Sequence, residues 1–189
     1  VAYAPNVPQL INKDTVNLRI DVQNKKIYVN DEVSFTGWVF GDSLPGPVVR
    51  VKVGQVVHFT MANRSNDNVG VAPPMPHSID FHAAMVNPAD KYQSVSPGSQ
   101  ISFYWKAVYP GVFMYHCGTP MIMQHMIYGM IGMVIVDPKE GFPGKVDTAF
   151  TLIQSELYLR KTGNHTYMPD VVAAEKKALE EKLAAEKQA

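Results

Sequence analysis

Short runs of alternating apolar and polar residues, many of them β-branched, make up most of the chain after Val16. A period of two residues predicts half-buried strands. The predicted strands are residues 16–22, 26–29, 33–40, 48–53, 56–61, 78–82, 100–107, 112–117, 130–136 and 149–153. Turn signals such as Leu44-Pro45-Gly46-Pro47 and Tyr109-Pro110-Gly111 separate them. Many short strands without intervening helices predict an all-β Greek-key sandwich or barrel.

The two ends of the chain depart from this pattern. We predict three parts, an extended N-terminal arm, a β domain, and a connector with a C-terminal helix, over residues 1–14, 15–155 and 156–189. The helix is expected from Val171 to Lys187, because Asp170 can cap it and the segment contains no Gly or Pro. A segment of this length is marginal as an isolated helix, so it should pack either on its own domain or on a neighbouring subunit.

Composition narrows the function classes. The 189-residue chain carries 17 basic and 17 acidic residues, and no Lys/Arg block stands out. This balance gives no sign of a polyanionic partner such as nucleic acid. The longest apolar runs are strand-sized, so no membrane span is expected. Val1 lacks the charged start and apolar run of a signal peptide, as in a chain numbered from a processed N-terminus.

The most informative motif surrounds the only cysteine. Cys117 follows His116 directly and precedes His125 by eight residues, with Met130 five residues further on. One thiolate, two imidazoles and a weak axial methionine form the trigonal site that holds redox-active copper in electron-transfer proteins. Zinc would need no methionine, and the paired CxxC or HxxxH spacing of structural zinc sites is absent. We therefore predict an electron-transfer copper, and copper chemistry favours a periplasmic or otherwise exported location.

Strand parity divides the ligands between two metal positions. Adjacent residues of a strand point to opposite faces, so His116 and Cys117 point apart. The same holds for His77 and His82, five residues apart, if their strand is unbroken. The first ligand set then consists of one histidine from each of the two segments, the cysteine and the methionine: His77, Cys117, His125 and Met130. The second ligand set is His82 and His116. Five more methionines are expected as an apolar surround of the first set: Met114, Met121, Met123, Met126 and Met133.

The second ligand set is chemically different from the first. It offers nitrogen alone and leaves room for water or substrate, so a third ligand must come from elsewhere in the chain or from another subunit. Asp80 is two residues from His82, on the same face, where a carboxylate could pass a proton to a bound oxyanion. The alternative for Asp80 is an ordinary surface position. His165 is a weak candidate for the third ligand, and His58 is interpreted as a strand histidine.

These motifs resemble the N-terminal cupredoxin domain of copper-containing nitrite reductases, and related patterns occur in laccase-like multicopper oxidases. The likeness is carried by Leu44-Pro45-Gly46-Pro47, by Pro76-His77-Ser78-Ile79-Asp80-Phe81-His82-Ala83-Ala84, and by Tyr115-His116-Cys117 through His125 and Met130. It runs from about Val16 to the connector near Tyr167. The fold class that it implies is a Greek-key cupredoxin β-sandwich.

The resemblance implies a role for each ligand set. The first set would hold type 1 copper and the second set type 2 copper, with Asp80 as the acid that protonates nitrite. Electrons from a small redox protein would enter at type 1 and pass to type 2, where nitrite becomes nitric oxide and water. Family members trimerise, and a second cupredoxin domain of the neighbour completes the type 2 site. The sequence offers no match to that domain.

Two functions from different classes follow. The first is an oxidoreductase of the nitrite reductase type that works as an oligomer, with a trimer as the expected form. His82, His116 and Asp80 favour it, because a type 1 site needs none of them. The second is a single-domain electron carrier with type 1 copper alone, which the missing second domain favours. A copper-storage role is a weaker idea, since the methionines follow strand and loop patterns rather than a repeated metal motif.

Overall fold

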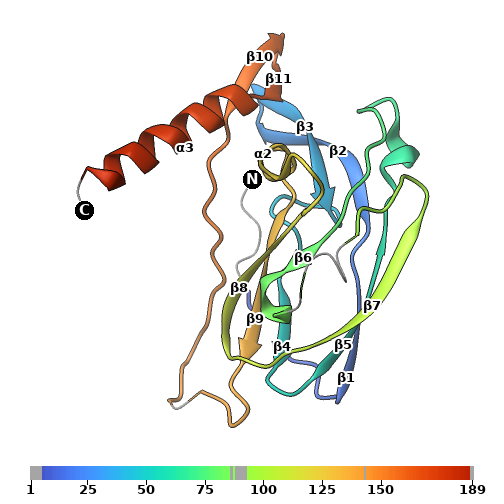
Figure 1. Cartoon of the computed structure of the whole chain (residues 1–189), viewed down its shortest axis with the longest axis vertical. Coiled ribbons are helices and arrows are strands. Elements are labelled where there is room, and N and C mark those ends of the chain that lie inside the picture. Colours follow the sequence, from blue (N-terminus) through green and yellow to red (C-terminus); the bar gives the residue numbers. More distant parts are fainter. Residues whose placement is uncertain (1–5, 86, 88–92, 143, 188–189) are drawn as a thin grey trace.

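The computed structural model describes residues 6–85, 87, 93–142 and 144–187, and shows a β-sandwich with a helix at its C-terminal end (Figure 1). Its strands carry the following bounds: β1 Thr15–Arg19, β2 Val22–Asn30, β3 Val33–Phe40, β4 Val49–Lys52, β5 Val56–Ala62, β6 Asp80–Phe81, β7 Gln100–Lys106, β8 Gly111–His116, β9 Ile131–Asp137, β10 Leu159–Gly163 and β11 Thr166–Pro169. The helical segments are η1 Ser65–Asn68, η2 His82–Ala84, α2 Ile122–Ile127 and α3 Val171–Glu186.

The strands form three mixed sheets. Their orders are β1-β5-β7, β4-β9-β8-β6 and β10-β11-β3-β2. The pairs β1/β5, β4/β9 and β11/β3 are parallel, and the other pairs are antiparallel. Parallel pairs need crossover connections, so the chain passes repeatedly between sheets and encloses, beside a smaller cluster around Phe35, one main core. That core contains Phe59, Phe81 and Trp105, and it extends to Cys117 and Met130.

Three strand predictions need correction. Residues 16–22 are divided between β1 and the start of β2, and residues 78–82 contain only the two-residue β6, because η2 begins at His82. The predicted strand 149–153 is wrong: its single β-contact is a bridge between Phe150 and Asn6. Leu152 is 79% exposed, so the alternation of this segment does not reflect burial against a sheet. Of the predicted arm, residues 1–5 lie outside the described residues.

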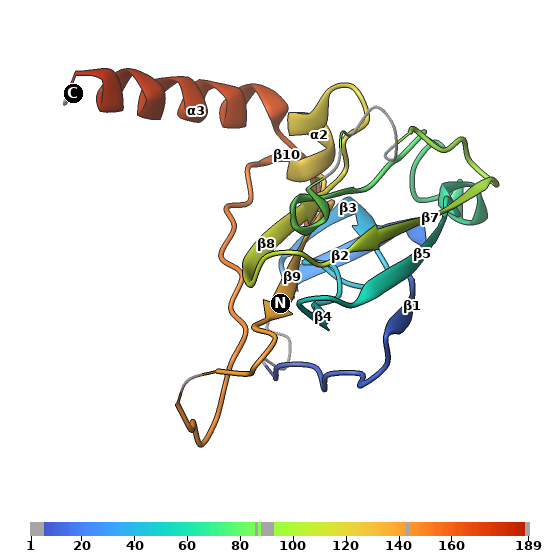
Figure 2. The same ribbon diagram turned by 60° about the horizontal axis from the view of Figure 1, so that its bottom comes forward.

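The C-terminal part combines a hairpin that the sequence did not predict with a helix that it did. The hairpin β10–β11 extends the sheet of β3 and β2, through the parallel pairing of β11 with β3. Helix α3 follows, and the Asp170 carboxylate accepts a hydrogen bond from the Ala173 N–H at 3.1 Å. In two views α3 extends away from the β-sandwich (Figures 1 and 2). Its apolar residues Val172, Leu179 and Leu183 are exposed.

None of the helices in the described part of the chain is both long enough and apolar enough to cross a bilayer.

Candidate metal centres

Four separate segments bring the first ligand set together. His77 lies before β6, Cys117 directly after β8, His125 on α2, and Met130 directly before β9. All four side chains are almost completely buried. His125 lies on α2, a helix too short for sequence periodicity to reveal.

The donor atoms of this set converge. His77 Nδ1 and His125 Nδ1 are 3.2 Å apart, and Cys117 Sγ is 3.3 Å from His125 Nδ1. Met130 joins the set through the backbone, since its carbonyl accepts from the Cys117 N–H at 3.2 Å and its N–H donates to the His125 carbonyl at 3.1 Å. Two imidazoles and a thiol gathered in this way match the donor set of electron-transfer copper.

Electrostatics keep both imidazoles of the first set neutral. Burial, with a smaller contribution from His125, lowers the pKa of His77 to about 3, and burial also lowers the pKa of His125. Two neutral imidazoles whose Nδ1 atoms face each other at 3.2 Å need a proton or a cation between their lone pairs. A soft metal cation satisfies that need, so the residues fit a bound copper ion.

Aromatic packing fixes the two rings. Trp38 on β3 lies against both, with ring centroids 5.4 Å from His77 and 5.0 Å from His125. Tyr128 stacks on Trp38, with ring centroids 4.1 Å apart. Sequence reasoning missed Trp38, because a buried strand tryptophan has the same pattern as any core residue. The rings are therefore held before any metal binds.

The end of β8 is anchored one residue before the ligands. The Tyr115 hydroxyl donates to the Pro47 carbonyl at 2.7 Å, which explains the Leu44-Pro45-Gly46-Pro47 turn seen in the sequence. A Cβ at Gly132 would lie 2.1 Å from the Tyr115 ring, so only glycine leaves room for that ring. Burial raises the pKa of Tyr115, which keeps the phenol protonated as a donor. The anchor therefore fixes where His116 and Cys117 begin.

The second ligand set lies on the other side of the same strand. His82 Nε2 and His116 Nε2 are 3.0 Å apart, and Asp80 pairs with His116 across β6 and β8. The possible ligand atoms of these three residues all lie within 4.8 Å of one another. His82 is exposed, while Asp80 and His116 are half-buried. This group is open to small molecules in solution, and the first set is not.

A hydrogen bond links the two groups. His116 Nδ1 lies 2.8 Å from the Cys117 carbonyl oxygen, an acceptor, so Nδ1 carries the proton. That tautomer leaves His116 Nε2 with its lone pair directed toward His82, as a metal ligand requires. The two sites are thus joined both by a peptide bond and by a hydrogen bond.

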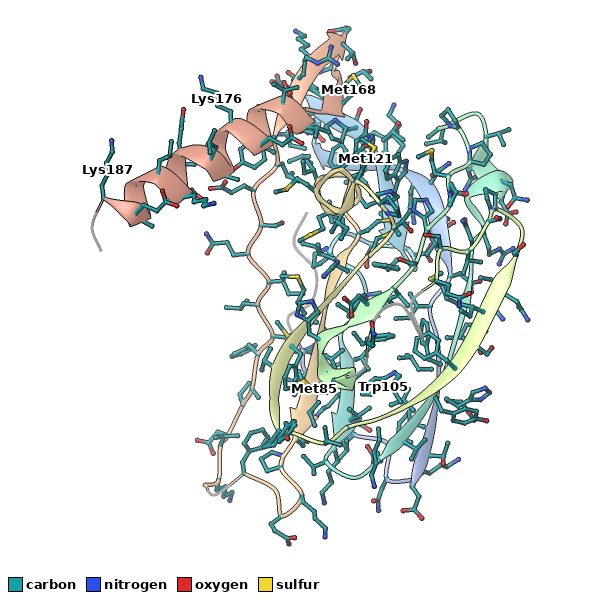
Figure 3. All side chains as sticks on the ribbon, viewed as in Figure 1. Met85, Trp105, Met121, Met168, Lys176 and Lys187 are labelled. Atoms are coloured by element: carbon teal, nitrogen blue, oxygen red, sulfur yellow. The ribbon has the colours of Figure 1, made fainter. Side chains whose placement is uncertain are left out.

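The parity argument separated the histidines correctly, although one premise fails. His116 ends β8 and Cys117 follows it directly, but His77 lies outside β6 and His82 begins η2. The methionine surround is only partly present, because Met114, Met121 and Met123 are exposed. Met121, labelled in Figure 3, directly precedes α2 and is 69% exposed.

The remaining two histidines lie in neither group. His58 is half-buried on β5, where its Nδ1 is 3.2 Å from Asn17 Oδ1 and its ring stacks on Tyr104 with centroids 4.4 Å apart. His165 lies in the β10–β11 turn, with its Nδ1 3.2 Å from the Glu32 carbonyl. His165 therefore does not complete the second ligand set within this chain.

Comparisons with known proteins agree with this geometry. The family model described as multicopper oxidase matches residues 21–141. The chain is 33% identical over 162 residues to the copper-containing nitrite reductase of Neisseria meningitidis serogroup A, which covers 84% of this chain and 40% of the relative. The corresponding protein of Neisseria gonorrhoeae gives the same identity and coverage. The chain thus spans about 40% of the length of these relatives.

Solved structures show the same relationship. Copper nitrite reductase from Nitrosomonas europaea superposes with a TM-score of 0.59 and 35% identity, over 67% of this chain and 42% of that one. A nitrite reductase from Thermus scotoductus gives 0.58 and 33%, over 67% and 29%. The predicted cupredoxin fold is confirmed, as a sandwich of mixed sheets with a C-terminal helix. The chain belongs to the multicopper oxidase family, as a cupredoxin domain related to the copper-containing nitrite reductases.

Proposed function

We propose that this chain is part of a copper oxidoreductase of the nitrite reductase type. In this proposal the first ligand set holds a type 1 copper, and the second set, with Asp80, forms a type 2 copper site. The observation that carries it is the placement of two ligand groups on consecutive residues, His116 and Cys117, at the end of β8. A carrier with one copper would need only the first group.

When bound, copper would supply the one-electron chemistry at both sites, where one electron from a small redox protein and two protons would convert nitrite into nitric oxide and water. The protein residues divide the other tasks. The first ligand set excludes water, because all its side chains are buried. The His116–Cys117 peptide and the 2.8 Å hydrogen bond between the same residues offer short paths from the buried group to the exposed one.

Asp80 supplies the proton chemistry in this proposal. Its carboxyl group shares the face of His82 and His116 and is half-buried, so it can reach both solvent and a small oxyanion. A positioned carboxylic acid of this kind donates a proton to the oxygen that leaves nitrite as water. Two histidines and one carboxylate also suit other small oxyanions, and nitrite is chosen from the relatives.

A second polypeptide or a symmetric copy would complete the second ligand set. His58 and His165 lie elsewhere in the chain, so a third histidine would have to come from outside the described residues. Cyclic packing would repeat one interface around a ring and place a neighbouring subunit over the His82–His116 pair of each subunit. We propose that this ring is a trimer. An exported, periplasm-like location belongs to the same proposal.

The second candidate function is a single-domain electron carrier with type 1 copper alone. It is favoured by the second ligand set, which offers two histidines and one carboxylate among the described residues. Copper analysis with electron paramagnetic resonance separates the two functions. Two coppers per chain with both signals, and nitrite consumed with a reduced donor, would support the reductase. One copper with only a type 1 signal would support the carrier.

A further inference from the structure

Ser78 lies between the two ligand-bearing segments. It follows His77 directly, is fully buried, and contacts the cysteine of the other segment. Its backbone N–H donates to Cys117 Sγ at 3.4 Å, and its hydroxyl oxygen lies 3.9 Å from the same sulfur. Nothing in the family match or in the metal-binding pattern gives this side chain a role.

The other contacts of the Ser78 hydroxyl determine where its proton points. A serine hydroxyl has one proton and two lone pairs. The Gly118 N–H donates to this oxygen at 2.9 Å, and the Thr119 hydroxyl donates to it at 3.3 Å. Both lone pairs are then occupied, so the remaining proton is available for Cys117 Sγ.

The same reasoning extends one residue outward. Thr119 uses its only hydroxyl proton toward Ser78, so it can only accept from Ser94, whose hydroxyl oxygen lies 3.0 Å away. Ser94 therefore donates to Thr119. Ser78 and Thr119 are buried, while Ser94 is exposed. The three hydroxyls thus donate in one direction, from the surface toward the sulfur.

We propose that Ser94, Thr119 and Ser78 form a directional hydroxyl chain that donates to the Cys117 sulfur and raises the reduction potential of the copper site. This proposal rests on the proposed type 1 copper. A hydrogen bond to the thiolate reduces the electron density that sulfur gives to the metal, and the oxidised ion depends on that density more than the reduced ion does. Donation along a chain polarises each successive bond, so the outer hydroxyls strengthen the last one.

The hydroxyl chain lies beside the buried cysteine rather than in the open second group, so Ser78 and Thr119 act as positioning residues. A purely structural role is the competing explanation, because the Ser78 hydroxyl also ties Gly118 to the segment of His77. Thr119 separates the two explanations. Replacing its hydroxyl leaves the bond between Gly118 and Ser78 in place and removes only the directional donation.

The test compares Thr119→Val with Thr119→Ser in the copper-loaded full chain. Valine keeps the shape of threonine and removes the hydroxyl, while serine keeps the hydroxyl and removes a methyl group. We expect Thr119→Val to have a lower reduction potential by spectroelectrochemical titration and a shifted thiolate-to-copper absorption band. Thr119→Ser should keep the wild-type potential. Ser94→Ala should change the potential in the same direction as Thr119→Val, by a smaller amount.

A double-mutant cycle gives a second test. Ser78→Ala should lower the potential more than Thr119→Val, and adding Thr119→Val to Ser78→Ala should change nothing further, because the chain is already broken. Equal potentials for Thr119→Val and Thr119→Ser would overturn the hydroxyl chain, as would additive shifts in the double variant. A wild-type protein without a thiolate-to-copper band would overturn the type 1 site itself, and the hydroxyl chain with it.

Discussion

The two ligand groups meet at adjacent residues at the end of β8, His116 and Cys117, but their surroundings differ. Cys117 points into the core, where His125, Met130 and Trp38 enclose it. His116 points to the other face, toward exposed His82. The alternation of a single strand thus produces one dry group and one open group. A dry group suits transfer of an electron alone, and an open group suits a substrate that brings atoms and protons.

The dry group also carries an energetic cost that the open group does not. Two nitrogen atoms near it, His77 Nε2 and Trp38 Nε1, are buried without a hydrogen-bond partner among the described residues. A buried unsatisfied polar group costs about 1–3 kcal/mol. Such a cost in a packed core is expected where a site has been selected for function rather than for stability. Exposed His82 and half-buried His116 can bond to water instead.

Replacing Cys117 tests the dry group with the largest expected effect. Cys117→Ala should abolish the thiolate-to-copper visible absorption completely, because the chain has no second thiol. The change removes one small buried side chain, so the fold should persist in far-UV circular dichroism. The absorption spectrum of the copper-loaded variant is the measurement. A retained visible band would mean that Cys117 is not the ligand.

Replacing His82 tests the open group in the opposite way. His82→Ala should keep the visible band and remove nitrite turnover in the assembled protein, because His116 would be left as the only nitrogen ligand from this chain. His58→Ala is the control, since His58 is a half-buried histidine that lies in neither ligand group. The control should keep both band and turnover. Turnover unchanged in His82→Ala would exclude a type 2 role for that residue.

Asp80→Asn should give a smaller, graded effect within the open group. The amide keeps the size of the carboxyl group and cannot deliver its proton, so turnover should fall by about 10²–10⁴-fold, the usual contribution of a general acid. The visible band should not change. Steady-state rates of nitrite consumption measure the effect. A rate equal to that of the wild type would assign Asp80 to an ordinary surface position.

The sequence predicts the ligands better than the parts that hold them. Cysteine, histidine and methionine carry metal chemistry in their identity, and residue parity at the end of β8 is local, so the split between His116 and Cys117 follows from the sequence. Helix α2 has six residues, too few for an apolar pattern to repeat over several turns. The segment 63–76 is rich in polar residues, yet Asn63 and Ser65 within it are buried. An asparagine in a polar loop has the same local pattern whether it faces water or the core, so only tertiary packing reveals its role.

Asn63 carries the smallest of the predicted effects and shows how far the dry group extends. Its side-chain amide donates to the Val95 carbonyl at 2.8 Å and to the Met75 carbonyl at 2.7 Å. Val95 in turn exchanges two backbone hydrogen bonds with His77, at 2.7 and 3.1 Å. Asn63→Ala should therefore lower the free energy of unfolding of the metal-free chain by about 2 kcal/mol, because buried carbonyls lose their donor. Urea denaturation measures this loss.

The matched control for Asn63 is Asn17→Ala, at an exposed asparagine bonded to His58 on the surface of the sandwich. Substitutions at such positions change the free energy of unfolding by about 0.5 kcal/mol or less. Asn63→Ala should also shift the visible band of the copper-loaded chain, since His77 loses part of its support, while Asn17→Ala should not. Equal losses of stability and unchanged spectra in both variants would mean that the dry group is held by its own ligands and aromatic neighbours alone. The contrast between the two asparagines therefore measures how much of the surrounding fold is committed to keeping His77 in place.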